Sequence, residues 1–157
     1  MIGDRRPEEA SIPEFWRVIA PFVLVGVGGA LGACTRNGVS DLIDDVWSRA
    51  FPLDTFLVNI SGSFLLSLFL TALSLRTGKY AGLTFLVSTG FLGGYTTFST
   101  FSDETAKLIR ADNWGIALLY VGLLLSCGIS AALAGYILAV KKLQPHPVQV
   151  EANASTP

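Results

Sequence analysis

Four apolar stretches, separated by charged residues, run along this chain of 157 residues. Each stretch has at least about 17 residues, the length that an α-helix needs to cross the hydrocarbon core of a bilayer. The pattern therefore predicts an all-α membrane protein with four transmembrane helices. The predicted spans are residues 18–35, 55–75, 81–102 and 113–140.

Aromatic and amphipathic residues flank these spans. Trp16 and Trp114 stand at span entrances, where an amphipathic ring prefers the level of the lipid headgroups. Between the first two spans, residues 39–50 place apolar side chains at helical spacing, with acidic residues on the opposite face. This arrangement predicts a short interfacial helix that connects the two spans.

The composition is typical of a membrane protein, because 51% of the residues are hydrophobic, 15% are charged and the mean hydropathy is +0.54. We expect a multi-pass protein of a cell inner membrane or plasma membrane. The net charge of −1 gives no indication of a nucleic-acid partner, and the single histidine, His146, offers no metal cluster. The polar tails, residues 1–16 and 143–157, are predicted to be disordered, which leaves a four-span domain over residues 17–142.

Positive charges give only a weak preference for one orientation. An even number of spans places both termini on one side of the membrane, where seven Lys and Arg residues would lie, against four on the other side. Three of the seven precede the first predicted span, so termini inside the cell are only slightly favoured. A chain so balanced could insert in both orientations.

Both cysteines, Cys34 and Cys127, lie in apolar runs, where a small buried side chain is the ordinary role and a disulfide is not expected. An alternative interpretation is a bacterial lipoprotein signal cleaved before Cys34, because arginines and an apolar stretch precede the sequence Leu-Gly-Ala-Cys. Acidic residues in the leader argue against it, since a signal carries a positive N-terminal region. These acids are Asp4, Glu8, Glu9 and Glu14.

Small residues recur four positions apart in three of the predicted spans. Backbones can approach closely along such faces, either between helices of one chain or between subunits. Because four short spans enclose little space, we expect the subunits to oligomerise. The pairs are Gly28 and Gly32, Gly29 and Ala33, Ser63 and Ser67, Gly128 and Ala132, and Ala131 and Gly135.

No Asp, Glu, Lys or Arg lies centrally in a predicted span, which argues against a proton-coupled pump. The polar residues that remain are neutral. Asn59 is costly to bury without partners, and could either join helices or donate N–H bonds to a passing anion. Ser126 and Ser130 share a helix face and could extend a polar track, although each could equally bond back to its own helix.

Residues 90–101 (GFLGGYTTFSTF) combine three glycines with four Ser and Thr hydroxyls. They predict a break in the third span around residues 93–96, where unwound carbonyls could face a cation. We expect the helix to restart near Thr97. Phe98 and Phe101 share a face, and could be ordinary core residues. Alternatively, their positive ring edges could hold a desolvated anion beside hydroxyl and amide donors, weakly enough to release it.

The sequence contains the blocks GALGACTR (29–36), TFLVNISGSF (55–64) and GFLGGYTTFSTF (90–101). These three blocks resemble the signature blocks of the CrcB/Fluc family of fluoride channels, and the match covers most of residues 17–142. The resemblance implies four-span subunits that form an antiparallel homodimer, with two fluoride pores at the subunit interface. It also implies passive export of fluoride from the cytoplasm and no enzymatic activity.

The same resemblance implies roles for individual pore residues. Asn59 would be the pore asparagine, and Arg36 would lie near the aqueous mouth. Phe98 and Phe101 would line the fluoride path with their ring edges.

The resemblance also implies a structural sodium ion and a polar track in the fourth span. The backbone carbonyls of Gly93 and Thr96, from both subunits, would bind the sodium ion. Tyr120, Ser126 and Ser130 are the candidates for the track, and their spacing leaves open which of them lines the pore.

Two other functions are compatible with a small four-span chain. A small multidrug-type transporter can also form antiparallel dimers, but it needs a carboxylate embedded in the membrane. A membrane scaffold without transport activity would explain the faces of small residues but not the polar side chains of residues 90–101.

Overall fold

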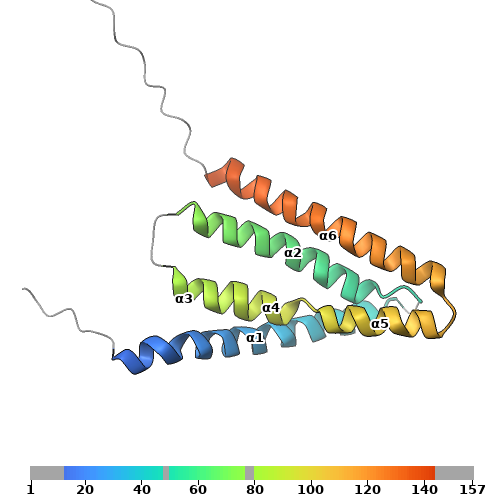
Figure 1. Cartoon of the computed structure of the whole chain (residues 1–157), viewed down its shortest axis with the longest axis horizontal. Helices are drawn as coiled ribbons and strands as arrows, with labels where there is room; N and C mark the ends of the chain where they lie inside the picture. Colours follow the sequence, from blue (N-terminus) through green and yellow to red (C-terminus); the bar gives the residue numbers. More distant parts are fainter. Residues whose placement is uncertain (1–12, 48–49, 77–79, 144–157) are drawn as a thin grey trace, which may run out of the picture.

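The computed structural model describes residues 13–47, 50–76 and 80–143, which form an elongated bundle of helices (Figure 1). By length and composition, three of its helices are long and apolar enough to cross a membrane. They coincide with the first, second and fourth predicted spans. These helices are α1 (Glu14–Asp44), α2 (Leu53–Ser74) and α6 (Trp114–Leu143).

The third span consists of several shorter pieces. A short helix α3 (Ala81–Leu83) leads into a π-helix η1 (Thr84–Leu92), then α4 (Gly93–Tyr95) and, after a break, α5 (Phe98–Arg110). Neither the π-helix nor the extension of the third segment to Arg110 follows from the hydropathy pattern. Both described ends of the chain lie at the same end of the bundle (Figure 1).

The break in the third span lies at Thr96 and Thr97, slightly later than predicted. The helix continues through the glycines to Tyr95, and the backbone then becomes extended, with ψ of 159° at Thr96 and φ of −147° at Thr97. Thr97 caps the next helix, because its side-chain oxygen accepts a hydrogen bond from the Thr100 N–H at 3.1 Å. The prediction that the helix restarts near Thr97 is confirmed.

The predicted interfacial helix over residues 39–50 is wrong. Helix α1 continues without interruption to Asp44, and the N–H groups of Asp45 and Trp47 still bond to the carbonyls of Asp41 and Ile43. The chain between the first span and Asp44 contains no proline, so nothing in the backbone stops the helix there. Residues 48 and 49, like the tail residues 1–12 and 144–157, lie outside the described residues.

Glycines bring α1 into direct contact with the backbone of the third span. A Cβ atom added at Gly28 or Gly32 would collide with the main chain of η1, and one added at Gly94 would collide with the main chain at Gly29. A Cβ at Gly135 would collide with the main chain of α2 at Phe64. These glycines therefore serve packing within one chain.

The outer surface of the bundle is strongly apolar. Large hydrophobic side chains are exposed along α1 and α6, as lipid or another apolar surface requires. Cys34 lies on this surface, so the prediction that it is buried is wrong, whereas Cys127 is half-buried; both are free thiols. The exposed large hydrophobic side chains include Phe22, Val27, Leu31, Leu118, Ile129 and Leu133.

Candidate functional site

A cavity of about 290 Å³ lies beside the break in the third span. It is lined by side chains from α2, from the break, from α5 and from α6. The structure thus brings together Asn59, Phe98 and Phe101, three of the residues predicted from the sequence. The remaining lining residues are Gly62, Ser63, Leu66, Thr96, Thr97, Leu124 and Leu125, and none of the residues around this cavity is charged.

Asn59 bonds to both backbone groups of Thr97. Its Oδ1 accepts from the Thr97 N–H at 2.9 Å, and its Nδ2 donates to the Thr97 carbonyl at 3.0 Å. A primary amide has two N–H groups, so a second one is left on Nδ2. The amide therefore satisfies the backbone where the helix is interrupted, which connects α2 to the break and keeps one donor beside the cavity.

The break also frees two backbone carbonyls, those of Gly93 and Thr96. In a continuous α-helix they would accept from the N–H groups of Thr97 and Thr100. The Thr97 N–H is instead donated to Asn59, and the Thr100 N–H to the Thr97 hydroxyl. Both carbonyls named in the sequence prediction thus lose their usual helical donors.

Phe98 and Phe101 lie on one side of α5, with ring centroids 5.8 Å apart and ring planes at 51°. Their environments differ. Phe101 is half-buried against Tyr120, with centroids 5.4 Å apart, whereas Phe98 is 79% exposed although it lines the cavity. Phe101 is therefore held by packing within its own chain, whereas the ring of Phe98 is accessible to another molecule.

The structure does not place the other predicted fluoride-binding residues in this cavity. Ser126 and Ser130 are exposed and donate back to their own helix, to the carbonyls of Gly122 at 2.7 Å and Ser126 at 2.8 Å. Helix α6 reaches the cavity through two leucines instead. Arg36 is half-buried on α1, which does not line the cavity.

Sequence reasoning missed a hydrogen-bonded cluster centred on Glu104 of α5. Its two carboxylate oxygens accept from the Thr55 hydroxyl at 2.9 Å and from the Tyr120 hydroxyl at 2.7 Å. Thr55 and Tyr120 are almost fully buried, at 2% and 0% exposure. The spacing of the residues could have indicated this position, because Glu104 follows Phe101 by three residues and so lies on the same face of the helix.

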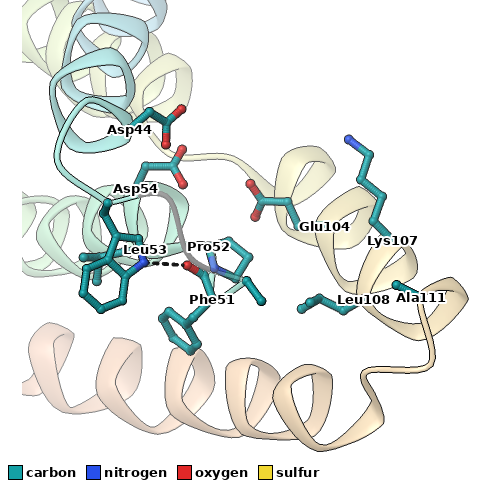
Figure 2. Close-up of a pocket in the computed structure, with 11 residues that line it drawn as sticks. Asp44, Phe51, Pro52, Leu53, Asp54, Glu104, Lys107, Leu108 and Ala111 are labelled. Carbon is teal, nitrogen blue, oxygen red and sulfur yellow. Dashed lines mark hydrogen bonds between the residues drawn. The ribbon is translucent and has the colours of Figure 1, made fainter.

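Glu104 also borders a second cavity, of about 390 Å³, between the C-terminal end of α1, the start of α2 and α5. In this cavity the carboxylates of Asp44 and Asp54 lie opposite Glu104, with Lys107 one turn further along α5 (Figure 2). Glu104 follows the end of the predicted third span, and its partial burial raises the pKa of the carboxyl, against the opposing effect of the two hydrogen bonds.

Comparison with known proteins identifies the family. The model of the family described as CrcB-like protein, Camphor Resistance (CrcB), matches residues 23–136. The chain belongs to this family. With its long apolar helices, it is a multi-pass membrane protein.

Several relatives of this CrcB-family chain are named fluoride-specific ion channel FluC 1. The protein from Listeria innocua is 44% identical over 120 residues, covering 76% of this chain and 97% of the relative. The protein from Listeria monocytogenes serotype 4b is 44% identical over 123 residues, covering 78% and 100%. The protein from Bacillus thuringiensis subsp. konkukian is 38% identical over 125 residues, covering 80% and 91%.

The region that matches the CrcB family includes every residue of the uncharged cavity. It begins in α1, contains all of α2 and the broken third span, and ends in α6. The family is one of ion channels, so this protein is not an enzyme.

Proposed function

We propose that this protein is a passive, fluoride-selective channel of the inner membrane, which exports fluoride from the cytoplasm down its electrochemical gradient. The observation that carries the proposal is the uncharged cavity at the break, where an amide donor and two phenylalanine rings meet. Neutral donors and positive ring edges can replace the water around a small anion without binding it too tightly to release. The names of the relatives support fluoride as the ion.

Two pores would form at the interface of an antiparallel homodimer. Phe98 lines the cavity and yet is 79% exposed, so a second subunit would cover this ring. The exposed Ser126 and Ser130 on α6 would face the ion path only with a partner in place, since they lie outside the cavity of a single chain. The balanced distribution of positive residues favours insertion in both orientations, as an antiparallel pair requires. Arg36 would lie near the aqueous mouth.

A structural sodium ion would bind the freed carbonyls of Gly93 and Thr96. Carbonyl oxygens suit a hard cation, and these two have lost their helical donors. At the break, one chain offers these two oxygens, and a twofold axis would double the number. The bound ion would supply positive charge that stabilises the unwound backbone at the centre of the dimer.

The test is fluoride release from liposomes that contain the purified protein, measured with a fluoride electrode and with chloride as the competing anion. We expect fluoride release and retention of chloride. Phe98→Ile and Phe101→Ile should each lower the fluoride rate at least about tenfold, because loss of the ring edge removes an interaction that partly replaces hydration.

Phe15→Ile is the matched control, because Phe15 is an exposed ring on the first turn of α1, outside the cavity. Wild-type fluoride rates in both cavity variants would remove the rings from the conduction path. Proton-coupled uptake of a cationic dye by the same liposomes would favour a multidrug-type transporter instead.

A further inference from the structure

Ser63 lies in the same cavity as Asn59, one helical turn further along α2. Residues four apart on an α-helix share a face, so the hydroxyl of Ser63 and the amide of Asn59 line one wall in succession. The sequence pattern suggested for Ser63 only a packing role, as a small residue paired with Ser67.

The other polar side chains of the cavity already have partners. The Asn59 amide bonds to Thr97 through both its oxygen and its nitrogen, and the Thr96 hydroxyl donates to the Leu92 carbonyl at 2.9 Å. The Thr97 hydroxyl bonds to the hydroxyl of Thr100 at 2.9 Å. Three side chains of the cavity are thus held by contacts within the protein.

The Ser63 hydroxyl differs from its neighbours, because it makes no hydrogen bond to any of the described residues. Two residues earlier on α2, Ser61 donates to the Leu57 carbonyl at 2.8 Å, which is the usual behaviour of a helical serine. The second N–H of Asn59 and the O–H of Ser63 are therefore two neighbouring donors that the protein leaves available in this cavity.

The helix opposite Ser63 leaves room beside the hydroxyl. On α6, a Cβ atom added at Gly128 would be 3.9 Å from the Ser63 Oγ, at ordinary van der Waals distance. The α6 side chains that line the cavity are Leu124 and Leu125, which offer no acceptor. A hydroxyl left without a partner in such apolar surroundings is costly, unless water or an ion occupies the space.

We propose that Ser63 is a further fluoride-binding residue, which donates its hydroxyl to the ion one helical turn beyond Asn59. The ion would pass from the Asn59 N–H to the Ser63 O–H along α2, and at each step a neutral donor replaces part of its hydration shell. This assignment rests on the proposed function and adds a residue to its ion path.

Ser63→Ala, Ser63→Cys and wild-type protein are compared in the fluoride-release assay over a range of fluoride concentrations. We expect both variants to lower the initial rate about tenfold and to raise the fluoride concentration needed for half of the maximal rate, since a hydrogen bond to a charged group is lost. Cysteine is nearly the same size as serine but a weak donor, so it preserves the packing. Ser67→Ala is the control, because Ser67 lies on the same helix, half-buried, outside the cavity, and should release fluoride at the wild-type rate.

The outcomes separate the two proposals. If the wild-type protein releases fluoride and Ser63→Ala shows the same rate and concentration dependence, the assignment of Ser63 is overturned but the channel is not. A slow alanine variant beside a fully active cysteine variant would also overturn the assignment, because packing and not hydrogen bonding would then matter. If Ser63→Ala does not fold, the cysteine variant decides by itself. Absence of fluoride release from wild-type protein would refute the channel and this assignment together.

Discussion

Replacing Asn59 by leucine should destabilise the protein, because the amide supports the break in the third span. Leucine has a similar size but cannot bond to the N–H and carbonyl of Thr97, a residue that is only 8% exposed. Each buried backbone group left without a partner costs about 1–3 kcal/mol. The free energy of unfolding should therefore fall by about 2–6 kcal/mol.

The measurement is denaturant-induced unfolding of the detergent-solubilised protein, followed by circular dichroism. Asn37→Leu is the matched control, because Asn37 is exposed on α1, and its free energy of unfolding should change by no more than about 0.5 kcal/mol. An Asn59→Leu variant as stable as wild type would refute the idea that this side chain holds the break together.

Asn59→Asp separates the stability of the break from ion conduction. The carboxylate can still accept from the Thr97 N–H, but it can no longer donate to the carbonyl, and it adds a negative charge to an uncharged cavity. We expect a smaller loss of stability than for leucine together with a near-complete loss of fluoride release. Unchanged fluoride release would remove the Asn59 amide from the ion path. Release from neither the wild type nor the variant would favour a scaffold without transport activity.

Two further predictions concern packing and the Glu104 cluster. Tyr120→Phe removes the hydrogen bond to Glu104 and should lower the free energy of unfolding by about 1.5–3 kcal/mol, the contribution of a hydrogen bond to a charged group. Tyr136→Phe, at an exposed position, is the control and should have little effect in the same unfolding assay. Gly32→Ala should lower the free energy of unfolding by at least about 1–3 kcal/mol, because the added methyl group collides with the backbone of the third span. Gly26→Ala is the control, since a Cβ atom there would meet no atom of another segment within 4 Å. Equal stability of the two variants would contradict the close packing of α1.

Hydropathy alone predicts where the long helices lie, because the membrane requires a long apolar run for each span. It does not predict their ends, as α1 shows: the helix runs nine residues beyond the predicted boundary at 35, to Asp44, since only a proline or a turn would stop it there. The position of the break was also missed slightly. It depends on Asn59, which is 38 positions away in the sequence, and not on the glycines alone.

The site was also predictable only in part, because some of its contacts join residues that are far apart in the sequence. Asn59, Phe98 and Phe101 could be found from their chemistry, and the structure brings them together. The fourth-span serines share a face as expected, yet in the single chain their hydroxyls bond to their own helix. The Glu104 cluster could not be derived from hydropathy, because Thr55 and Tyr120 belong to other helices and meet the carboxylate only after folding.

The two hydrogen bonds between Asn59 and the main chain of Thr97 limit how the protein can evolve. A contact between two side chains can be lost and regained by a second substitution at the partner position. Here both atoms that bond to Asn59 belong to the backbone, which every amino acid except proline carries in the same form. A genetic screen for suppressors of an Asn59 mutation should therefore recover no compensating change at position 97.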